Sequence, residues 1–441
     1  ARAAFPAWSA RPWSERAQLL ERAADMIRRR RYELSAWLIH EMGKNRIEAL
    51  GEVEETADLI SYYNEQMRLH NGYVHEMNRL VPTDRNTSVL RPYGVWAVVS
   101  PWNFPFALFG APIAAALLTG NTVVAKPSSD TPHIAIKFVE ILEEAGLPPG
   151  TISCIPGGGR VVGDALTNHP GVDGVTFTGS YDVGFKLYKG FATKVPKPCI
   201  TEMGGKNPAI VMESADLGKA VQGVYRSAFG MNGHKCSACS RVYVQRGVEA
   251  EFTAKLVAMT NATKIGNPLE KGVFAGPLAT KASYEDYQAF VALARAAGPD
   301  VLRAGGATLT DGAFAHGYFV KPTVVAGLPR DHELMRRELF VPLVAVTAID
   351  GIDEALALAN DTDFGLTAGL FSRQQAEIDA FVARIEAGVI YVNRAGGATT
   401  GAWPGVQPFG GWKGSGSTGK NIGGPHTLQC YLREQSRTIC E

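Results

Sequence analysis

The sequence predicts an α/β fold built around two parallel sheets. Between residues 94 and 190, short apolar runs such as 95–99 and 122–125 alternate with helix-like stretches. The same alternation begins again near Pro208 and continues to about residue 392. Strands that alternate with helices form parallel sheets whose faces are covered by the helices. A chain of 441 residues can bury a substantial core and divides into two or more domains.

The composition argues against two classes of partner. The net charge is +1, acidic and basic residues are interspersed, and the run Arg28–Arg31 fits the solvated end of an amphipathic helix. We therefore expect no nucleic-acid partner. No apolar run reaches membrane-spanning length without a breaker, since residues 106–118 are too few. We therefore expect no membrane association.

Six cysteines in a chain of this length do not indicate a disulfide framework. They indicate free thiols in a reducing compartment, and we expect a cytoplasmic protein. The chain starts without an initiator Met and close to a helix-like pattern. We therefore expect that an N-terminal segment precedes it.

Helices are predicted from residue 1 to about residue 70. Leu19, Leu20, Ala23 and Ile27 recur at helical spacing, residues 13–16 offer an N-terminal cap, and residues 58–67 continue the pattern. Residues 87–91 look instead like a short strand with polar edges, outside the main alternation.

The first alternating set contains four predicted strands, at 95–99, 122–125, 152–155 and 174–177, and four helices, at 106–118, 134–145, 161–166 and 183–188. Ligands of parallel sheets bind beyond the carboxyl ends of the strands. The residues that follow these strands include Asn103, Lys126, Gly157 and Gly179. We therefore expect a ligand site along this edge.

The second set begins with a strand near residues 208–212, a helix over 216–229 and a strand over 242–245. From Trp403 the chain is rich in Gly and Pro, and it closes with an apolar strand at 429–432. That strand has little core of its own, so it is either an oligomerising element together with residues 87–91 or an ordinary edge strand.

The stretch NGHKCSACSR, residues 232–241, carries the clearest chemical signal. Gly230 and Gly233 place Cys236 on a loop between the helix and the strand. Because His234 and Lys235 adjoin the thiol, we expect a lowered pKa, which favours the nucleophilic thiolate. A structural cysteine in a turn fits these ten residues equally well.

The spacing of Cys236 and Cys239 also allows a redox pair or half of a zinc site. A redox pair needs a thioredoxin-like context, and a zinc site needs a second ligand pair, which the sequence lacks. We expect no metal.

Two more stretches decide between these readings. Residues 201–208, TEMGGKNP, and residues 101–105, PWNFP, resemble the aldehyde dehydrogenase superfamily together with the cysteine loop, and further matches extend over essentially the whole chain. The resemblance implies a Rossmann-like cofactor domain of residues 1–76 and 93–204 and a catalytic domain of residues 205–402. It also implies an oligomerisation flap and substrate-anchoring loop in residues 77–92 and 403–441, and hence a homo-oligomer, a dimer or higher.

The resemblance assigns three catalytic roles. Cys236 attacks the aldehyde, and the amide of Asn103, with the backbone N–H of the cysteine, stabilises the oxyanion that forms. Glu202 activates the water that hydrolyses the thioester. A carboxylate between apolar residues and the flexible Gly204-Gly205 has a raised pKa, which suits a general base. A CoA-acylating enzyme is disfavoured because this glutamate is present, and a catalytically silent relative is disfavoured because all three residues are present.

The cofactor implied by the resemblance is NAD. The stretch 157–163 is a loosened Gly-x-Gly-x-x-Gly pattern, and residues 177–184 resemble the turn at which a helix N-terminus meets the pyrophosphate. The residues that we expect to bind the cofactor are Trp102, Lys126, Ser128, Ser129, Gly159, Gly163, Gly179, Ser180, Glu338 and Phe340.

Two positions depart from the family pattern around the cofactor. Ser129 stands where members that prefer NAD often carry a glutamate, so a 2′-phosphate is not excluded and NADP is a second candidate. Val341 stands where the family usually has glycine, which leaves the tightness of that turn open.

The cysteine loop and residues 400–411 look most like the branch of the family that acts on 1-pyrroline-5-carboxylate, oxidising glutamate γ-semialdehyde to glutamate in proline catabolism. Gly401 permits the close backbone approach that an anion-binding loop needs. A different aldehyde remains the alternative, since residues 396–399 look like an insertion before the loop. The residues that we expect to bind the substrate are Phe104, Lys235, Ser237, Gly401, Ala402 and Phe409.

Overall fold

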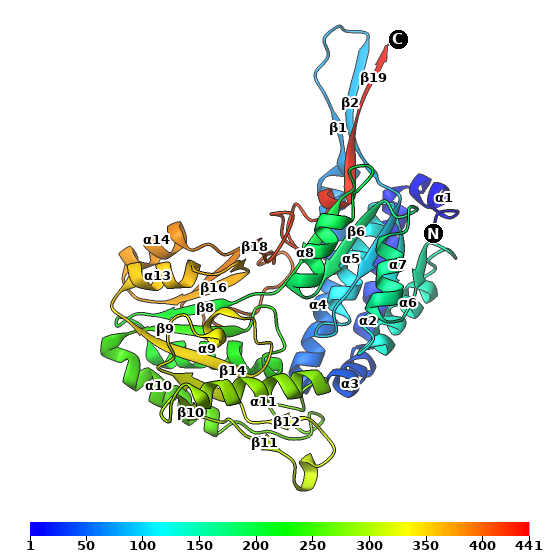
Figure 1. Cartoon of the computed structure of the whole chain (residues 1–441). Coiled ribbons are helices and arrows are strands. Elements are labelled where there is room, and N and C mark those ends of the chain that lie inside the picture. The colour runs from blue at the N-terminus through cyan, green and yellow to red at the C-terminus, as the bar shows by residue number, and fades with distance from the viewer. Residues whose placement is uncertain (441) are drawn as a thin grey trace.

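The computed structural model describes residues 1–440 and has two lobes, each built on one sheet, with a narrow arm projecting from the first lobe (Figure 1). Both sheets are predominantly parallel and both carry helices on two faces. The predicted α/β class with two parallel sheets is therefore confirmed. No helix within residues 1–440 has the length and apolar character needed to cross a bilayer.

The first sheet has five strands in the order β5-β4-β3-β6-β7, and every neighbouring pair is parallel. The register aligns the carboxyl ends, since Val99 pairs with Lys126 and with Phe177. The strands are β3 (Val95–Val99), β4 (Thr122–Lys126), β5 (Ile152–Cys154), β6 (Gly174–Thr178) and β7 (Cys199–Glu202).

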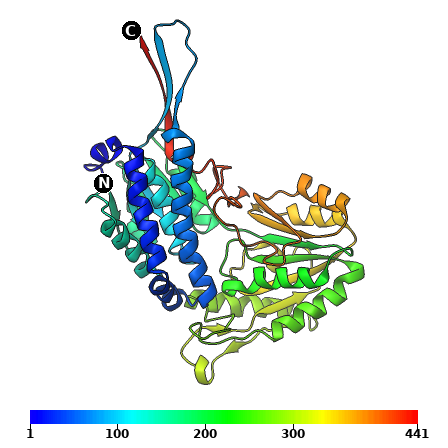
Figure 2. The ribbon, with the colours of Figure 1, turned by 180° about the vertical axis from the view of Figure 1, so that it is seen from behind.

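Alternate residues of β3 enter different cores, because successive side chains of a strand point to opposite faces. Trp96 and Val98 join the large cluster under the helices of one face, whereas Ala97 joins the smaller cluster of the other face. The first face carries α2 (Trp13–Arg29), α3 (Arg31–Met42), α4 (Arg46–Leu69), α5 (Ala107–Leu118) and α6 (Pro132–Glu144), of which α2 and α4 pack side by side (Figure 2). The other face carries α7 (Asp164–Thr167) and α8 (Tyr181–Gly190), and α1 (Phe5–Ala10) precedes them all.

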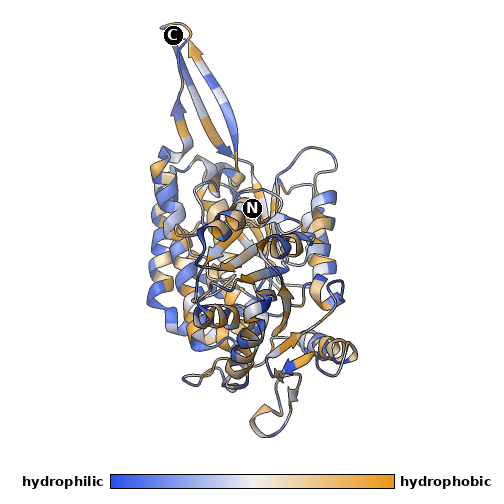
Figure 3. Ribbon diagram, turned by 90° about the vertical axis from the view of Figure 1, so that its left-hand side faces the viewer, coloured by the Kyte–Doolittle hydropathy of each residue, from blue (hydrophilic) through white to orange (hydrophobic). Residues whose placement is uncertain are grey.

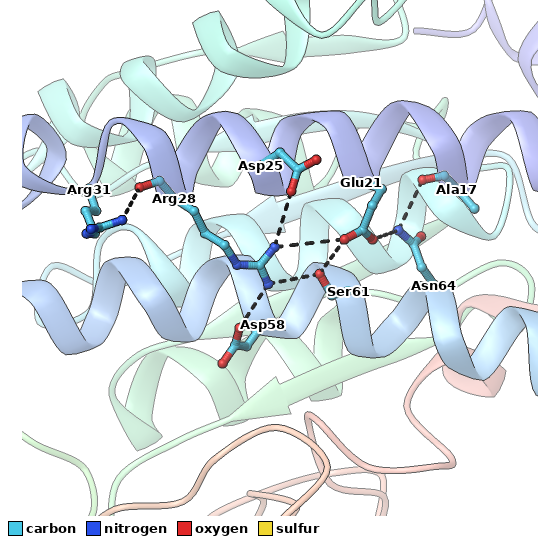
Figure 4. A network of polar contacts seen from close by, with 8 residues as sticks. All are labelled: Ala17, Glu21, Asp25, Arg28, Arg31, Asp58, Ser61 and Asn64. Carbon is cyan, nitrogen blue, oxygen red and sulfur yellow. Dashed lines mark hydrogen bonds and ion pairs between the residues drawn. The ribbon is translucent and has the colours of Figure 1, made fainter.

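A polar network joins α2 to α4 at their outer seam (Figure 4). Arg28 donates to Asp58 over 3.0 Å and to the Ser61 hydroxyl over 3.1 Å, and Glu21 accepts from Ser61 and Asn64. Exposed ion pairs of this kind contribute about 0–1 kcal/mol each, so the apolar seam supplies most of the stability.

The second sheet has seven strands in the order β10-β13-β14-β9-β8-β16-β17, parallel throughout except for β10. They are β8 (Asn207–Val211), β9 (Cys239–Gln245), β10 (Leu302–Ala304), β13 (Thr323–Ala326), β14 (Leu343–Ile349), β16 (Thr367–Phe371) and β17 (Val389–Val392). One face packs against α9 (Leu217–Phe229) and α10 (Arg246–Asn261). The other packs against α11 (Lys281–Ala296), α12 (Glu333–Arg336), α13 (Ile352–Asn360) and α14 (Gln375–Arg384).

The two sheets meet at opposite kinds of edge. The chain passes from the carboxyl end of β7 to the amino end of β8 through residues 203–206 alone. Cys236 precedes β9 and Glu338 precedes β14, so both lie at the amino edge of the second sheet. The carboxyl edge of the first sheet therefore faces the amino edge of the second.

The arm is a three-stranded antiparallel sheet in the order β1-β2-β19. Its strands are β1 (Val74–Glu76), β2 (Asp84–Pro92) and β19 (Leu432–Cys440). Its ribbon is coloured mostly as hydrophilic with a few apolar patches (Figure 3), and Leu80 at its tip is 93% exposed.

The predicted helix over 161–166 is present, and its first part is a π-helical turn, Gly159–Gly163, that leads into α7. Two other local predictions were wrong. Helix α2 begins after Pro12 and has no side-chain cap, since proline already sets the first turn. Residues Leu428–Tyr431 form a 3₁₀ turn instead of an apolar strand, because Tyr431 is buried against Trp96 with ring centroids 4.7 Å apart. The strand that follows is polar and exposed.

Candidate active site

The loop of Cys236 has an unusual backbone. After α9 ends, Met231, Asn232 and Gly233 take successive φ values of 52°, 54° and 70°. Left-handed non-glycine residues cost about 1–3 kcal/mol each and persist only where their surroundings hold them. Asn232 is held by its side chain, which donates to the carbonyl oxygens of Gly276 and Pro277.

Contacts with carbonyl oxygens of this loop fix it against the chain that follows Glu202. Asn207 donates its side-chain amide to the carbonyl oxygens of Cys236 over 2.7 Å and of Ala238 over 2.9 Å. A Cβ at Gly205 would lie 2.6 Å from the Cys236 carbonyl oxygen, so only glycine fits there. The nucleophile loop therefore packs directly on the connection between the two sheets.

The structure brings Asn103 into contact with this loop. Its side chain is 4% exposed, and Nδ2 donates to the carbonyl oxygen of His234 over 3.1 Å. An amide nitrogen carries two hydrogens, so one remains to stabilise a charge beside Cys236.

Glu202 lies at the carboxyl end of β7 and is 5% exposed. Burial raises the pKa of its carboxyl well above the usual value, although a hydrogen bond from the Gly411 N–H acts in the opposite direction. Its Oε2 has no hydrogen-bond partner among residues 1–440. A buried carboxyl of raised pKa is the form that the sequence predicted.

The predicted lowering of the Cys236 pKa was wrong. Burial raises the pKa of this thiol to about 12, and the negative charges of Glu338 and Glu202 add to the rise. His234 supplies no positive charge, because burial lowers its pKa to about 4 and its Nδ1 lies 2.8 Å from the Phe340 carbonyl oxygen. Dehydration and the two negative charges therefore have a larger effect on the pKa of Cys236 than the positive charge of the neighbouring Lys235.

Seven of the predicted cofactor residues lie along the carboxyl edge of the first sheet. Ser129 donates its hydroxyl to the Gly157 carbonyl oxygen over 3.0 Å, which links the loops after β4 and β5. The aliphatic stem of Lys126 lies beside Gly163, and its ammonium donates to the Pro127 carbonyl. The other four of these residues are Ser128, Gly159, Gly179 and Ser180, and Ser180 stands at the N-terminus of α8.

Of the remaining three predicted cofactor residues, Trp102 follows β3 at the same edge, and Glu338 and Phe340 lie across from it, before β14. Trp102 packs edge-on against His234 and Phe340, with ring centroids 4.8 and 5.5 Å away. Glu338 accepts from the Gly205 N–H over 2.9 Å, and burial raises its pKa to about 7. Phe340 has a φ of 57°, so the turn closes tightly with Val341 in place of glycine.

A cavity of about 260 Å³ opens beside Cys236. Its wall includes all six predicted substrate residues, namely Phe104, Lys235, Ser237, Gly401, Ala402 and Phe409. The hydroxyl of Ser237 and the ammonium of Lys235 have no hydrogen-bond partner within residues 1–440. The Ser237 hydroxyl is therefore free to bind an anion. Burial lowers the pKa of Lys235, whereas the nearby Glu48 carboxylate favours the charged form of this lysine.

The loop that closes this cavity is held from behind. Arg394 donates to the carbonyl oxygens of Thr400 and Gly401, and the Thr399 hydroxyl donates to the Ser237 carbonyl over 2.7 Å. Gly401 has a φ of 102°, which glycine alone adopts readily. The segment 396–399, which looked like an insertion, packs on α9 through a hydrogen bond from the Ala398 N–H to the Gly223 carbonyl.

One wall of the cavity was not predicted from the sequence. Glu48, Glu52, Glu55 and Leu59 line it from a single face of α4. Their spacing of four, three and four residues is the helical signal that could have identified this face. Glu55 has no hydrogen-bond or ion-pair partner in the described part of the chain, and burial followed by the charge of Glu52 raises its pKa to about 8.

No three His, Cys, Asp or Glu side chains within residues 1–440 gather in a group that could hold a metal ion. The six cysteines are all free. The functional groups that the structure gathers at this site are a thiol, an amide and buried carboxyls.

Comparison with known proteins defines the class. Residues 1–436 match the aldehyde dehydrogenase family, and the chain belongs to this family. It is 40% identical over 444 residues to the 1-pyrroline-5-carboxylate dehydrogenase of Geobacillus kaustophilus, covering 99% of this chain and 83% of that protein. It is 41% identical over 445 residues to the enzyme of the same name from Anoxybacillus flavithermus, covering 100% of this chain and 84% of the relative.

A solved structure of 1-pyrroline-5-carboxylate dehydrogenase from Thermus with bound NAD is also similar. It superposes with a TM-score of 0.94 at 35% identity, covering 100% of this chain and 84% of that one.

The raised thiol pKa generates a direct prediction. Without cofactor or substrate, alkylation of Cys236 by iodoacetamide should accelerate about tenfold per pH unit from pH 7 to pH 10, because the thiolate fraction keeps growing below a pKa of about 12. Peptide mass spectrometry measures the rate at this cysteine. The unfolded protein in urea provides the control and should level off near pH 9. A plateau between pH 6 and pH 8 in the folded protein would contradict the buried, protonated thiol.

Proposed function

We propose that this aldehyde dehydrogenase oxidises L-glutamate γ-semialdehyde to L-glutamate through a thioester on Cys236, as a step of proline catabolism. The observation that carries the proposal is the cavity beside Cys236, which presents the Ser237 hydroxyl and the Lys235 ammonium for an anion and the Glu55 carboxyl for a cation. The names of the two bacterial relatives support the same substrate. A carboxylate-bearing semialdehyde without an amino group is the alternative.

The first step forms a bond between Cys236 Sγ and the aldehyde carbon. The S–H bond breaks as the S–C bond forms, and the thiol proton leaves to water, so that the Glu202 carboxylate is kept for the second half of the reaction. The carbonyl oxygen becomes an oxyanion, and the free N–H of Asn103 binds it. One such donor supplies roughly 3–4 kcal/mol of transition-state stabilisation.

NAD, when bound, supplies the hydride acceptor that turns this adduct into a thioester. Glu202 then takes a proton from water, the hydroxide attacks the thioester carbon, and the C–S bond breaks to release the acid and the thiol. Glycines at 204 and 205 follow the carboxylate in the chain and leave room for Glu338 and for the Cys236 carbonyl oxygen close to it.

The two ends of the proposed substrate fit different walls of the cavity. The Ser237 hydroxyl, the Lys235 ammonium and the backbone N–H groups at Gly401 and Ala402 would hold the carboxylate. Glu55 would accept the α-ammonium, because an arriving cation lowers the pKa of a buried carboxyl and favours its charged form. Phe104 and Phe409 supply the apolar sides.

The residues proposed to hold the dinucleotide follow the carboxyl edge of the first sheet. The N-terminus of α8 at Ser180 would face the pyrophosphate. Lys126, Ser128 and Ser129 would contact the adenosine ribose. Gly159 and Gly163 would form the loop beside this ribose. Glu338, Phe340 and Trp102 would flank the nicotinamide half. The Thermus relative binds NAD.

NAD is the first choice of cofactor and NADP the second, because no carboxylate stands at Ser129. Steady-state kinetics with the two cofactors should therefore differ only modestly. An overwhelming preference for NAD would contradict this interpretation of Ser129.

We further propose that the chain forms a homo-oligomer through the arm. Strand β19 pairs on one side only, and Val74, Met77, Leu80, Val81 and Ile439 are exposed apolar residues on this sheet or its tip (Figure 3). Unpaired, partly apolar edges favour pairing with another chain. A monomeric mass in light scattering would contradict the proposal. The six free cysteines support a cytoplasmic location.

Replacing the base should separate the two halves of the reaction. Glu202→Gln should still release about one equivalent of NADH in a burst and then stop, with a thioester at Cys236 visible in intact-protein mass spectrometry. Cys236→Ala should lose both the burst and turnover. Unchanged steady turnover of Glu202→Gln would contradict the assignment of the base.

Replacing the cation-binding carboxyl should distinguish the two candidate substrates. Glu55→Gln should raise the KM for glutamate semialdehyde about 10- to 100-fold, since a hydrogen bond between charged groups is lost. The same substitution should leave the KM for succinic semialdehyde almost unchanged, because this aldehyde lacks the amino group.

Glu54→Gln is the matched control, because Glu54 pairs with Arg31 on the outer side of the same helix. An equal effect of Glu55→Gln on both aldehydes would exclude the proposed role of Glu55.

A further inference from the structure

Helix α4 contacts the nucleophile loop through one carboxylate. Oε1 of Glu48 accepts the N–H of Met231 over 2.7 Å. Met231 is the first of the three left-handed residues that lead to Cys236. Gly230 beside it leaves room for the contact, since a Cβ there would lie 2.8 Å from Lys235 Nζ and 3.3 Å from Glu48 Oε1. Glu48 thus holds the loop at the point where its strained backbone begins.

The next turn of the same helix contacts the turn that carries Asn103. Oε1 of Glu52 accepts the N–H groups of Phe106 over 2.8 Å and of Ala107 over 3.1 Å. These are the first N–H groups of α5, where a negative charge is favourable. Asn103 stands three residues before Phe106.

A buried cation completes the second contact. The other oxygen of Glu52 pairs with Lys44, and neither side chain is exposed. The Lys44 ammonium also lies 4.1 Å from the ring centroid of Phe104, the residue next to Asn103. Lys44 and Glu52 therefore hold the PWNFP turn from two sides.

We propose that Glu48 and Glu52 are positioning residues, which set the distance between the Cys236 sulfur and the Asn103 amide. The two glutamates lie four residues apart, so they project from one face of α4. Glu48 binds a loop of the second lobe, and Glu52 binds a turn of the first. A single helix therefore fixes the oxyanion site across the junction. This inference rests on the proposed roles of Cys236 and Asn103.

The helix itself is anchored at both lobes. Asn45 caps its N-terminus, with Oδ1 accepting from the N–H groups of Ile47 and Glu48. The same side chain donates to the Phe274 carbonyl oxygen of the second lobe over 3.0 Å. The start of α4 is therefore fixed where the two glutamates act.

The test is the burst of NADH in the Glu202→Gln background, which isolates acylation from hydrolysis. Glu48→Ala should slow the burst about 10- to 100-fold for every aldehyde, an unsubstituted one included, with little change in the aldehyde concentration at half-maximal rate. Glu48→Gln should retain the rate, because an amide oxygen still accepts the Met231 N–H. Glu65→Ala is the control, since Glu65 lies exposed on the same helix.

The outcomes separate three accounts. Absence of a burst in Glu202→Gln alone would mean that the proposed function fails. If Glu202→Gln alone gives a normal burst, two results would overturn the positioning role. One is an unchanged burst rate in Glu48→Ala, and the other is a Glu48→Gln variant that is as slow as Glu48→Ala. A slower rate for glutamate semialdehyde only would overturn it too, because Glu48 would then bind substrate.

Glu52 needs paired variants, since its removal alone leaves Lys44 charged and buried. Lys44→Met with Glu52→Gln keeps an acceptor for the N–H groups of α5, whereas Lys44→Met with Glu52→Ala removes it. The first double variant should keep the burst rate within about threefold, and the second should lose about tenfold or more. Equal rates in two variants of equal melting temperature would overturn the role of Glu52.

Discussion

Close contacts with the backbone of the Cys236 loop, at the junction of the two sheets, determine this active site. Gly205 lies against the Cys236 carbonyl, and Asn207 donates to two carbonyl oxygens of the same loop. The first contact leaves no room for a side chain at position 205, and the second fixes the loop in place. The residues on either side, Asn103 and Glu202, come from the carboxyl edge of the other sheet. Their convergence therefore depends on how closely the two edges approach.

Burial at this junction disfavours every charge that the reaction needs. The pKa values of Cys236, Glu202 and Glu338 are all raised, chiefly by dehydration. A carboxyl whose folded pKa exceeds its unfolded value binds protons more tightly when folded, so it costs stability as the pH rises above about 4.5. Several buried carboxyls around one cavity, among them Glu55, Glu202 and Glu338, lower the stability of the fold in this way. A protonated thiol is also poorly reactive, which protects it until a reaction partner arrives.

The sequence was sufficient for the fold class, for the strand ends of the first sheet and for the motif-bearing residues. Local signals failed where tertiary contacts decided the outcome. The predicted lowering of the Cys236 pKa relied on the charge of its neighbours in the sequence. Burial keeps His234 neutral, and two carboxyls that are distant in the sequence, Glu338 and Glu202, raise the pKa of the thiol. Tyr431 looked like strand and is instead an anchor in the core. The acidic face of α4 went unnoticed because nothing in a lone helix indicates which face meets a cavity.

The central claim is that the thiol of Cys236 and the amide of Asn103 act on one carbonyl oxygen. The most direct measurement is a crystal structure of Glu202→Gln trapped as the thioester. The account predicts an acyl oxygen within about 3.2 Å of both Asn103 Nδ2 and the Cys236 backbone nitrogen, with the acyl chain in the cavity lined by α4. An acyl oxygen that faces away from Asn103, or a chain outside that cavity, would contradict it.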